Sequence, residues 1–298
     1  MPTVRLVALT LLAMIAFACN SLLCRLALKH TIIDAATFTA VRIAAGALVL
    51  WIIVRAQRDT ATGSGTWLSA IALFVYAAGF SFAYVSLPAS TGALLLFGAV
   101  QATMIGRGVW RGERLRKWQL VGLALAFGGL FGLFLPGVSA PPLFGSLLML
   151  SAGAAWGMYS LRGRGAGDAT RVTAGNFLRA VPIAVGLSLL MRDSSMFDVA
   201  GLLYAIASGA VASGIGYAIW YTALPALKAT SAATVQLSVP VITAVGGMIF
   251  LDETLSLRFF LASIAILGGI ALVIVEQRAA QPVNAERTDP NKSETKTL

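Results

Sequence analysis

Two arginines are the charged residues that lie deep inside the apolar segments of this sequence. Arg42 and Arg179 each come six to eight residues into a charge-poor run. A guanidinium inside a bilayer is costly unless it meets a partner, a backbone carbonyl or water. Its planar fork of N–H donors matches a carboxylate. We therefore expect each arginine either to clamp or gate a carboxylate ligand, or to bond the backbone end of a neighbouring helix.

Aromatic side chains recur at helical spacing in two corresponding segments. Tyr76, Phe80 and Tyr84 are four residues apart, and Tyr217 and Tyr221 repeat the last two after a shift of 137 positions. Such a stripe often only packs helices or contacts lipid. Tyrosine hydroxyls at mid-depth need polar partners, however, and a hydrated cavity supplies them while leaving ring faces for a ligand. The further aromatic candidates for substrate contact are Phe17, Trp156 and Tyr159.

Uncharged polar side chains form a third group of candidates. The mid-span members are Asn20, Gln101, Asn176, Gln236 and Ser238, and all but Asn176 are assigned to the binding site. These groups either bond between helices or hold the ammonium and carboxylate of a zwitterion. Pro240 deprives the carbonyl of Gln236 of its N–H partner, so we expect a bending point there.

Several kinds of chemistry are missing from the apolar segments. All twelve acidic residues lie in loops, at helix ends or near the C-terminus, and the single histidine, His30, lies at a segment end. Cys19 and Cys24 are the only cysteines. We therefore expect no metal site, no cofactor and no enzyme, since no general base lies at mid-depth. Without a buried proton relay, we expect gradient-driven uniport, with a proton-coupled antiporter as the alternative.

The composition requires a membrane around the chain. Apolar residues make up 58% and charged residues 11% of its 298 residues, and the mean hydropathy is +0.84. Soluble domains carry about 25% charged residues. Charge-poor runs of about 20 residues predict ten transmembrane helices. The net charge of +10 comes from arginines and lysines in short loops, so it indicates orientation rather than a nucleic-acid partner.

The chain consists of one unit used twice. Arg25 falls on Arg162 and Arg42 on Arg179 at a shift of 137, and Glu113 falls on Glu253 at a shift of 140. The predicted domains are a first five-helix repeat at 1–137, a second at 138–276 and a disordered cytoplasmic tail at 277–298. For the same reason, the first apolar run is read as a helix rather than a cleaved signal peptide.

Five helices per repeat invert the second copy. The fold class is therefore an all-α integral membrane protein with two inverted repeats and a site near the bilayer midplane. We expect this cavity between helices 1, 3, 4, 6, 8 and 9. With the N-terminus inside, thirteen arginines and lysines fall in cytoplasmic segments against four outside, which places both termini in the cytoplasm.

Two recurring motifs are read as structural. Glu113 and Glu253 stand in short turns, where we expect them to cap helices 5 and 10 or to pair with Arg116 or Arg258. Gly209 and Ser213 are four residues apart, a spacing that lets helices approach closely.

These features together resemble the drug/metabolite transporter superfamily, in its ten-helix branch of two EamA-type units. The resemblance rests on the five-plus-five duplication, on Cys19-Asn20-Ser21 to Arg25 with its counterpart Trp156-Gly157-Met158-Tyr159 to Arg162, and on the early arginines and Glu-containing turns. Within the superfamily the chain is most similar to exporters of aromatic amino acids. The resemblance implies export of small metabolites across a bacterial inner membrane.

The expected function is alternating-access export of aromatic amino acids by a monomer in the lipid bilayer. The alternatives are export of other amino acids or of lipophilic cations such as methyl viologen. An intramembrane enzyme and a channel are the alternative classes of function. Faster transport when unlabelled substrate is present on the far side of the membrane would distinguish a carrier from a channel.

Overall fold

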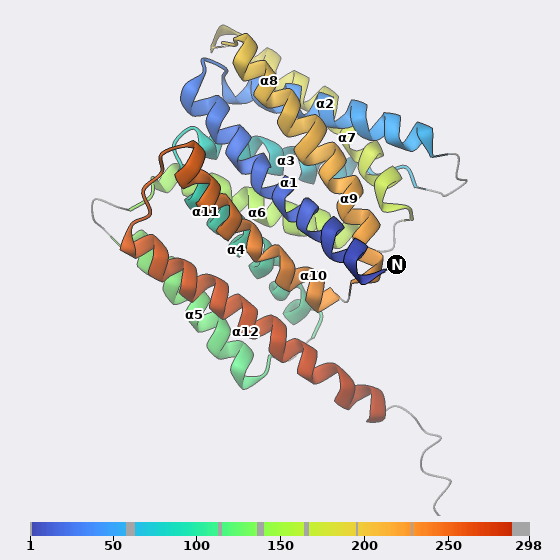
Figure 1. The fold of residues 1–298 in the computed structure, drawn as a ribbon, viewed down its shortest axis with the longest axis vertical. Coiled ribbons are helices and arrows are strands. Elements are labelled where there is room, and N and C mark those ends of the chain that lie inside the picture. Colours follow the sequence, from blue (N-terminus) through green and yellow to red (C-terminus); the bar gives the residue numbers. More distant parts are fainter. Residues whose placement is uncertain are drawn as a thin grey trace, which may run out of the picture.

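The computed structural model of the chain is a bundle of helices (Figure 1). It describes the backbone of residues 2–57, 63–112, 115–135, 140–163, 167–194, 196–227 and 229–287, and their side chains except at 194, 229–231 and 277–287. No strand occurs in these ranges. The α-helices are α1 (Thr3–His30), α2 (Ala35–Ala56), α3 (Trp67–Tyr84), α4 (Ala89–Trp110), α5 (Lys117–Phe134), α6 (Leu143–Gly163), α7 (Ala169–Leu190), α8 (Val199–Ala207), α9 (Gly216–Ala223), α10 (Ala229–Gln236), α11 (Ser238–Phe250) and α12 (Leu257–Arg287).

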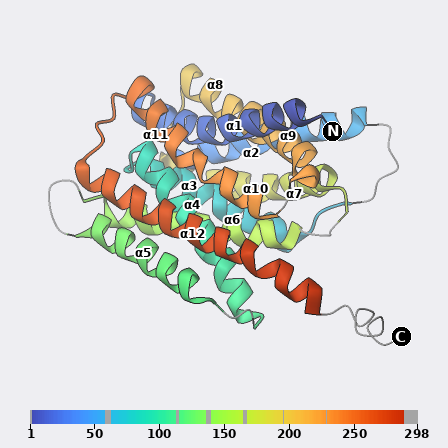
Figure 2. The same cartoon turned by 60° about the horizontal axis from the view of Figure 1, so that its bottom comes forward.

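Within the described ranges, the helices make ten passes through the bundle. The π-helical turn η2 (Ser208–Ile215) joins α8 and α9 into one pass, and α10 and α11 form another that is interrupted at Leu237. The interruption lies one residue after Gln236, near which a bending point was expected. The start of α1 and the end of α12 lie at the same end of the bundle (Figures 1 and 2), as an even number of passes requires.

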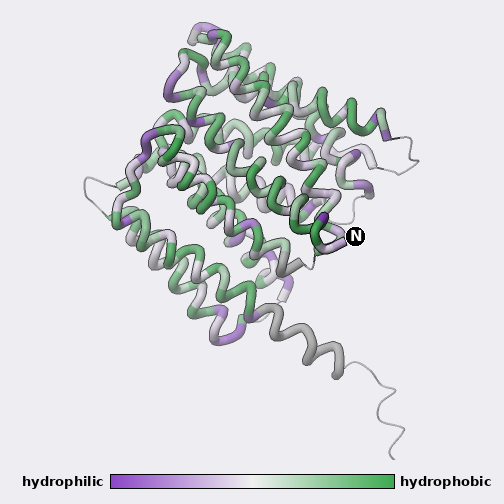
Figure 3. The backbone as a smooth tube through the Cα atoms, in the orientation of Figure 1, coloured by the Kyte–Doolittle hydropathy of each residue, from purple (hydrophilic) through white to green (hydrophobic). Residues whose placement is uncertain are grey.

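Nine of the described passes are long and apolar enough to span a membrane. The exception is α6, which has 21 residues but is rich in glycine and serine. It packs against α3 and α4, so protein rather than lipid surrounds much of it. The small residues of α6 allow it to pack closely on α4, because a Cβ at Gly153 would meet the backbone of α4. In Figure 3, hydrophobic residues follow the helices and hydrophilic residues gather at their ends.

The main helix contacts are unchanged when the two halves are exchanged. α6 packs on α3 and α4, and correspondingly α1 packs on the pass α8–α9 and on α11. Equivalent helices also pack on each other, α2 on α7 and α5 on α12, and α2 packs on the pass α8–α9 as α7 packs on α3. The two repeats are therefore interlocked rather than side by side, and the space at their centre belongs to both.

One predicted boundary needs correction. A tail was expected from residue 277, but α12 continues to Arg287, since alanine, glutamine and arginine favour a helix and Pro282 does not end it. Residues 288–298 and Glu113 lie outside the described residues.

Candidate functional site

A small cavity lies where the two halves meet. Its lining residues are Phe17, Asn20, Ser21, Tyr76, Phe80, Leu96, Phe97, Trp156, Ala212, Tyr217 and Gln236. They come from α1, α3, α4, α6, the pass α8–η2–α9 and α10, which are the six passes expected to border the site. The space open to the centre of a water molecule is about 20 Å³, which is room for one or two waters. The cavity is therefore closed around a volume smaller than an amino acid.

Arg42 lies directly behind the aromatic wall of the cavity. Its side chain is buried, with the residue 2% exposed, and its Nη2 donates to the Tyr76 hydroxyl at 3.0 Å. The guanidinium carbon lies 5.3 Å from the Tyr76 ring centre and 4.7 Å from that of Phe80. Its Nη1 is buried without a hydrogen-bond partner in the described part of the chain. The site thus holds a fixed positive charge with a donor to spare.

A chain of hydrogen bonds connects this charge to both halves of the molecule. The Asn20 amide donates to the Tyr76 hydroxyl at 3.2 Å, and its oxygen accepts from the Ser208 hydroxyl at 2.6 Å. Ser208 begins the π-helical turn η2. The Tyr76 hydroxyl accepts from Asn20 and Arg42 together, so its own proton can go to a further acceptor.

Stacked rings form the rest of the wall. Trp156 lies between Tyr159 and Tyr217, with ring centres 5.2 Å away on each side and interplanar angles of 22° and 23°. Phe17 meets Tyr217 edge-on at 5.7 Å, and Tyr76 lies 4.8 Å from Trp156. The contacts of Phe17 with Tyr217 and of Tyr76 with Trp156 cross between the repeats, so the cavity lies at a packing junction of the two halves.

Seven of the predicted site residues line this cavity. They are Phe17, Asn20, Tyr76, Phe80, Trp156, Tyr217 and Gln236. Arg42 contacts the lining through Tyr76 and Phe80. The remaining six predicted residues, which do not line it, are Tyr84, Gln101, Tyr159, Arg179, Tyr221 and Ser238.

The residues outside the lining have other contacts. Tyr84 is fully buried above Gly92, where a Cβ would strike its ring, and it donates to the Ala89 carbonyl at 3.3 Å. Tyr159 donates to Thr173 and accepts from Asn176, both at 3.3 Å. Ser238 donates to the Val235 carbonyl at 2.7 Å beside the interruption of the helix.

The last three of these residues lie farther from the cavity. Gln101 is buried on α4, and Tyr221 lies behind Tyr217 with ring centres 6.4 Å apart. Arg179 donates to the carbonyls of Ser64 and Gly175, which is the structural role weighed for it from the sequence. The contacts of Arg179 do not support the expected arginine gate at its mouth, and the gating role of Arg42 stays a prediction.

The sequence reasoning missed some lining residues. Ser21, Leu96, Phe97 and Ala212 line the cavity, and Ser208 contacts it through Asn20. Leucine, phenylalanine and alanine carry no signal in an apolar helix. Ser21 could have been found as a small polar residue next to Asn20 and one turn from Phe17, whereas Ser208 carries no comparable signal in the sequence.

Among the described residues, Asp34, Asp168, Asp198 and Glu253 lie at helix ends, and no acidic side chain lines the cavity. Glu253 accepts from the backbone N–H of Ala89 at 2.5 Å and from that of Ser90 at 3.2 Å. It thus caps α4, not the helix that follows its own turn, because the turn folds over the start of α4. On the same side, Arg25 donates to the carbonyls of Tyr84 and Val85, at 2.7 and 3.0 Å.

Asp34 caps α2 on that side. It accepts from the N–H groups of Ala36 and Thr37, both at 2.9 Å, and from that of Met196 at 3.1 Å. Burial opposes ionisation, but the hydrogen bonds outweigh it, so the pKa of Asp34 lies below its ordinary value of 3.8. Asp34 therefore stays ionised and holds the loop before α8 to the start of α2.

Comparison with known proteins adds the family. The model of the EamA-like transporter family matches residues 143–275. The uncharacterized protein PA1977 of Pseudomonas aeruginosa is 56% identical over 284 residues, which cover 94% of this chain and 99% of that protein. A solved crystal structure covers 92% of this chain and 99% of its own, with a TM-score of 0.65 and 19% identity; it shows the fold alone.

More distant relatives have a described activity. The threonine/homoserine exporter RhtA of Escherichia coli is 32% identical over 146 residues, which are 47% of this chain and 49% of RhtA. RhtA of Salmonella typhimurium is 31% identical over 129 residues, 42% of this chain and 43% of RhtA. The nine apolar passes of the described chain, the interlocked halves and these matches lead to one conclusion: the chain belongs to the EamA-like transporter family and is a multi-pass membrane transporter, not an enzyme.

Proposed function

We propose that this protein exports amino acids, with aromatic amino acids as preferred substrates, by alternating access to the cavity between its halves. The observation that carries the proposal is the buried Nη1 of Arg42, which has no partner in the described chain. An unpartnered charged donor in a dry interior is costly. A substrate carboxylate would satisfy it, and the Tyr76 proton would supply a second bond to the same group.

The aromatic wall supports the preference for flat side chains. Trp156, Tyr217 and Tyr76 present rings around the same recess, and such rings stack on an aromatic or other apolar ligand. Asn20 and Gln236 line the recess too, and their amide oxygens are acceptors for a substrate ammonium. One recess therefore offers partners for every part of an aromatic amino acid.

The closed volume of the cavity supports a conformational cycle. About 20 Å³ cannot hold a substrate, so the halves must part to admit one. Polar contacts close each end: Arg25 with the carbonyl end of α3, and Arg162 with Ser69 at the start of α3, at 3.3 Å. Arg25 and Arg162 are equivalent in the two repeats. Releasing one set while the other holds is the motion that alternating access requires.

The driving force we propose is the substrate gradient. No aspartate, glutamate, histidine or lysine is among the residues that line the cavity, so no carboxylate there can exchange a proton for substrate. A proton flux in fixed ratio to substrate, measured with a pH-sensitive dye in proteoliposomes, would contradict uniport. We also propose a monomer in a bacterial inner membrane with both termini cytoplasmic. Labelling of a single cysteine placed near each terminus tests this orientation.

Threonine and homoserine are the second candidate substrates. The similarity to RhtA over about half of the chain favours them. They share the carboxylate and ammonium but would leave the rings without a stacking partner. Uptake of radiolabelled phenylalanine, tryptophan, threonine and homoserine into proteoliposomes, each at the same concentration, decides between the two. Preference for phenylalanine and tryptophan supports the aromatic assignment, and preference for threonine and homoserine overturns it.

A further inference from the structure

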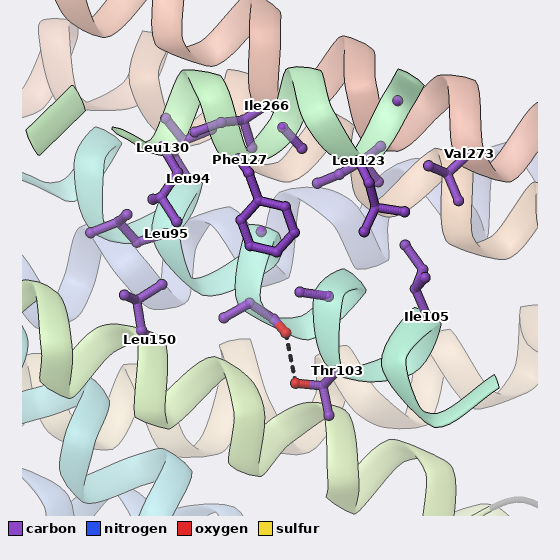
Figure 4. A pocket seen from close by; sticks show the side chains of 16 residues that line it. Leu94, Leu95, Thr103, Ile105, Leu123, Phe127, Leu130, Leu150, Ile266 and Val273 are labelled. Carbon is purple, nitrogen blue, oxygen red and sulfur yellow. Dashed lines mark hydrogen bonds between the residues drawn. The ribbon is translucent and has the colours of Figure 1, made fainter. Parts of the chain in front are cut away.

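A second cavity lies between α4, α5 and α12, outside the central one (Figure 4). The space open to the centre of a water molecule is about 260 Å³, against about 20 Å³ in the central cavity. Its walls include Leu94 and Ile105 of α4, Phe127 and Leu130 of α5, and Ile266 and Val273 of α12. The Phe127 ring points between α4 and α5 in Figure 4.

The wall of this cavity has no polar group to offer. Its only hydroxyl belongs to Thr103, which donates to the Ala99 carbonyl of its own helix at 2.8 Å (Figure 4). The other lining residues are glycine, alanine, leucine, isoleucine, valine and phenylalanine. A zwitterion would lose its hydration here without compensation. The cavity therefore suits hydrocarbon and cannot be a second amino acid site.

The cavity has the length of one leaflet. Leu94 and Ile105 are eleven residues apart on α4, or about 16 Å along a helix. Half of the hydrocarbon core of a bilayer is about 15 Å. Gly122 and Gly129 let α5 pack closely on α12, since a Cβ at either would strike that helix. The interface between α5 and α12 is therefore closed, and the cavity lies between this pair and α4.

Basic and tryptophan residues lie on α4 and α5 just beyond one end of the cavity lining. Arg107 follows Ile105 by two residues, and Lys117 begins α5 five residues before Gly122. Trp110 is 83% exposed and lies 5.3 Å from the Arg107 guanidinium, and Trp118 is also exposed. Tryptophan with arginine and lysine is the pattern of the headgroup level, where basic residues attract anionic lipids.

The third helix contributes to the same end. Glu276, three residues after Val273 on α12, pairs with Arg116 at 3.5 Å. This pair occupies Arg116, while Arg107 and Lys117 are exposed. The charge at this end of the apolar slot is thus complementary to an anion, and the slot is walled by α4, α5 and α12 with Leu150 of α6.

We propose that the slot binds an anionic phospholipid from the leaflet on the side of the chain termini. One acyl chain fills the space between α4 and the α5–α12 pair, and the headgroup lies against Arg107 and Lys117. Bound in this way, the lipid joins the α5–α12 pair to α4, which contributes Leu96 and Phe97 to the central cavity.

Native mass spectrometry of the whole purified protein tests this site. The probes are phosphatidylglycerol and phosphatidylcholine with the same acyl chains, titrated after delipidation. We expect one phosphatidylglycerol retained per chain. Ala102→Trp fills the slot and should abolish the retained molecule, while Leu120→Trp, on the exposed face of α5 and outside the slot, should keep it. Thermal unfolding of both variants shows that they are folded.

A charge variant separates the headgroup from the chain. Each basic residue near a membrane surface contributes about a fivefold preference for anionic lipid. The double variant Arg107→Gln/Lys117→Gln should therefore weaken phosphatidylglycerol binding roughly 25-fold and leave phosphatidylcholine binding unchanged. Arg192→Gln, at the other end of the molecule, should change neither. Equal retention of the two lipids by the unaltered protein, or retention by a folded Ala102→Trp variant, would overturn the proposal.

Discussion

Arg42 and Arg179 occupy equivalent positions 137 residues apart, yet their guanidinium groups have opposite surroundings. Arg42 faces two aromatic rings beside the central cavity and keeps one donor without a partner in the described structure. Arg179 donates to two backbone carbonyls, of Ser64 and Gly175. Of the two equivalent arginines, Arg42 is therefore the one with an unpartnered donor in the described structure. Variants of Arg42 and Arg179 can be compared to separate a ligand-binding role from a structural one.

Substitution of Arg42 should stop transport without unfolding the protein. Losing the pair between the Arg42 guanidinium and the substrate carboxylate costs about 2–5 kcal/mol of binding free energy. Arg42→Gln should therefore lower the uptake rate at low substrate concentration at least about thirtyfold. Its unfolding midpoint should stay or rise, because an unpaired buried charge is removed. Arg179→Gln should keep uptake within about threefold but lower the midpoint, since two carbonyls lose their donor. Equal transport loss in both variants would contradict the separate roles.

The Tyr76 hydroxyl should matter more than that of Tyr84. Tyr76→Phe leaves Arg42 Nη2 and the Asn20 amide without their acceptor, which costs about 1–3 kcal/mol. We expect a lower unfolding midpoint and reduced uptake. Tyr84→Phe removes one long bond to a carbonyl outside the cavity and should leave uptake unchanged. Radiolabelled uptake and thermal unfolding of the two variants, run in parallel, check this; an uptake defect confined to Tyr84→Phe would reverse the assignment.

Gly209 should be intolerant of any side chain. A Cβ there would collide with the backbone carbonyl of Arg42, and overpacking costs about 1–3 kcal/mol. Gly209→Ala should therefore lower the unfolding midpoint and shift Arg42. Gly186→Ala is the matched control: no atom lies within 4 Å of its Cβ, and alanine favours a helix by about 1 kcal/mol. Equal midpoints for the two variants would show that α2 and η2 do not touch as described.

Glu253 should stabilise the end of the bundle where α4 begins. Glu253→Gln removes the charge from the N-terminus of α4 and weakens three bonds to Ala89 and Ser90. Caps of this kind are worth about 1 kcal/mol. The midpoint of thermal unfolding should fall accordingly. Asp252→Asn alters the adjacent exposed carboxylate and tolerates its positive φ of 52°, so it should have no effect.

Acid should weaken the contact between α2 and the loop before α8. The pKa of Asp34 is lowered on folding, so its contribution to stability is fully present above the ordinary pKa and is lost as pH falls through the lowered one. The unfolding midpoints of the unaltered protein and Asp34→Asn should differ at pH 7 and converge below about pH 3.8. Asp193→Asn, whose side chain is 95% exposed, should show no such convergence. A gap that persists at low pH would contradict the role of this carboxylate.

The sequence predicted the passes and the cavity walls because both follow from periodicity. Apolar runs, the five-plus-five repeat and the inverted second half specify which helices meet at the centre, and Asn20, Tyr76 and Tyr217 meet there. Spacing alone could not separate Tyr76 from Tyr84. Tyr84 lies at the end of α3, where Gly92 of the next helix receives its ring, and that contact depends on the turn between them.

Other features depend on tertiary contacts that no local pattern encodes. Glu253 caps α4 across 164 positions of sequence, although its turn suggested a neighbouring helix. The π-helical turn η2 forms where Gly209 meets the backbone of α2 and Ser208 bonds to Asn20. The apolar slot between α4, α5 and α12 is lined almost entirely by aliphatic residues and glycines, which look the same in sequence whether they enclose space or fill it.

The most direct test of an amino acid carrier is counterflow in proteoliposomes. Vesicles loaded with unlabelled phenylalanine are placed in dilute radiolabelled phenylalanine, with the Arg42→Gln protein as the comparison. An alternating-access carrier accumulates the label transiently above equilibrium, and we expect this overshoot with the unaltered protein and none with Arg42→Gln. Label that rises only to equilibrium with the unaltered protein, or an equal overshoot with the variant, would contradict the account.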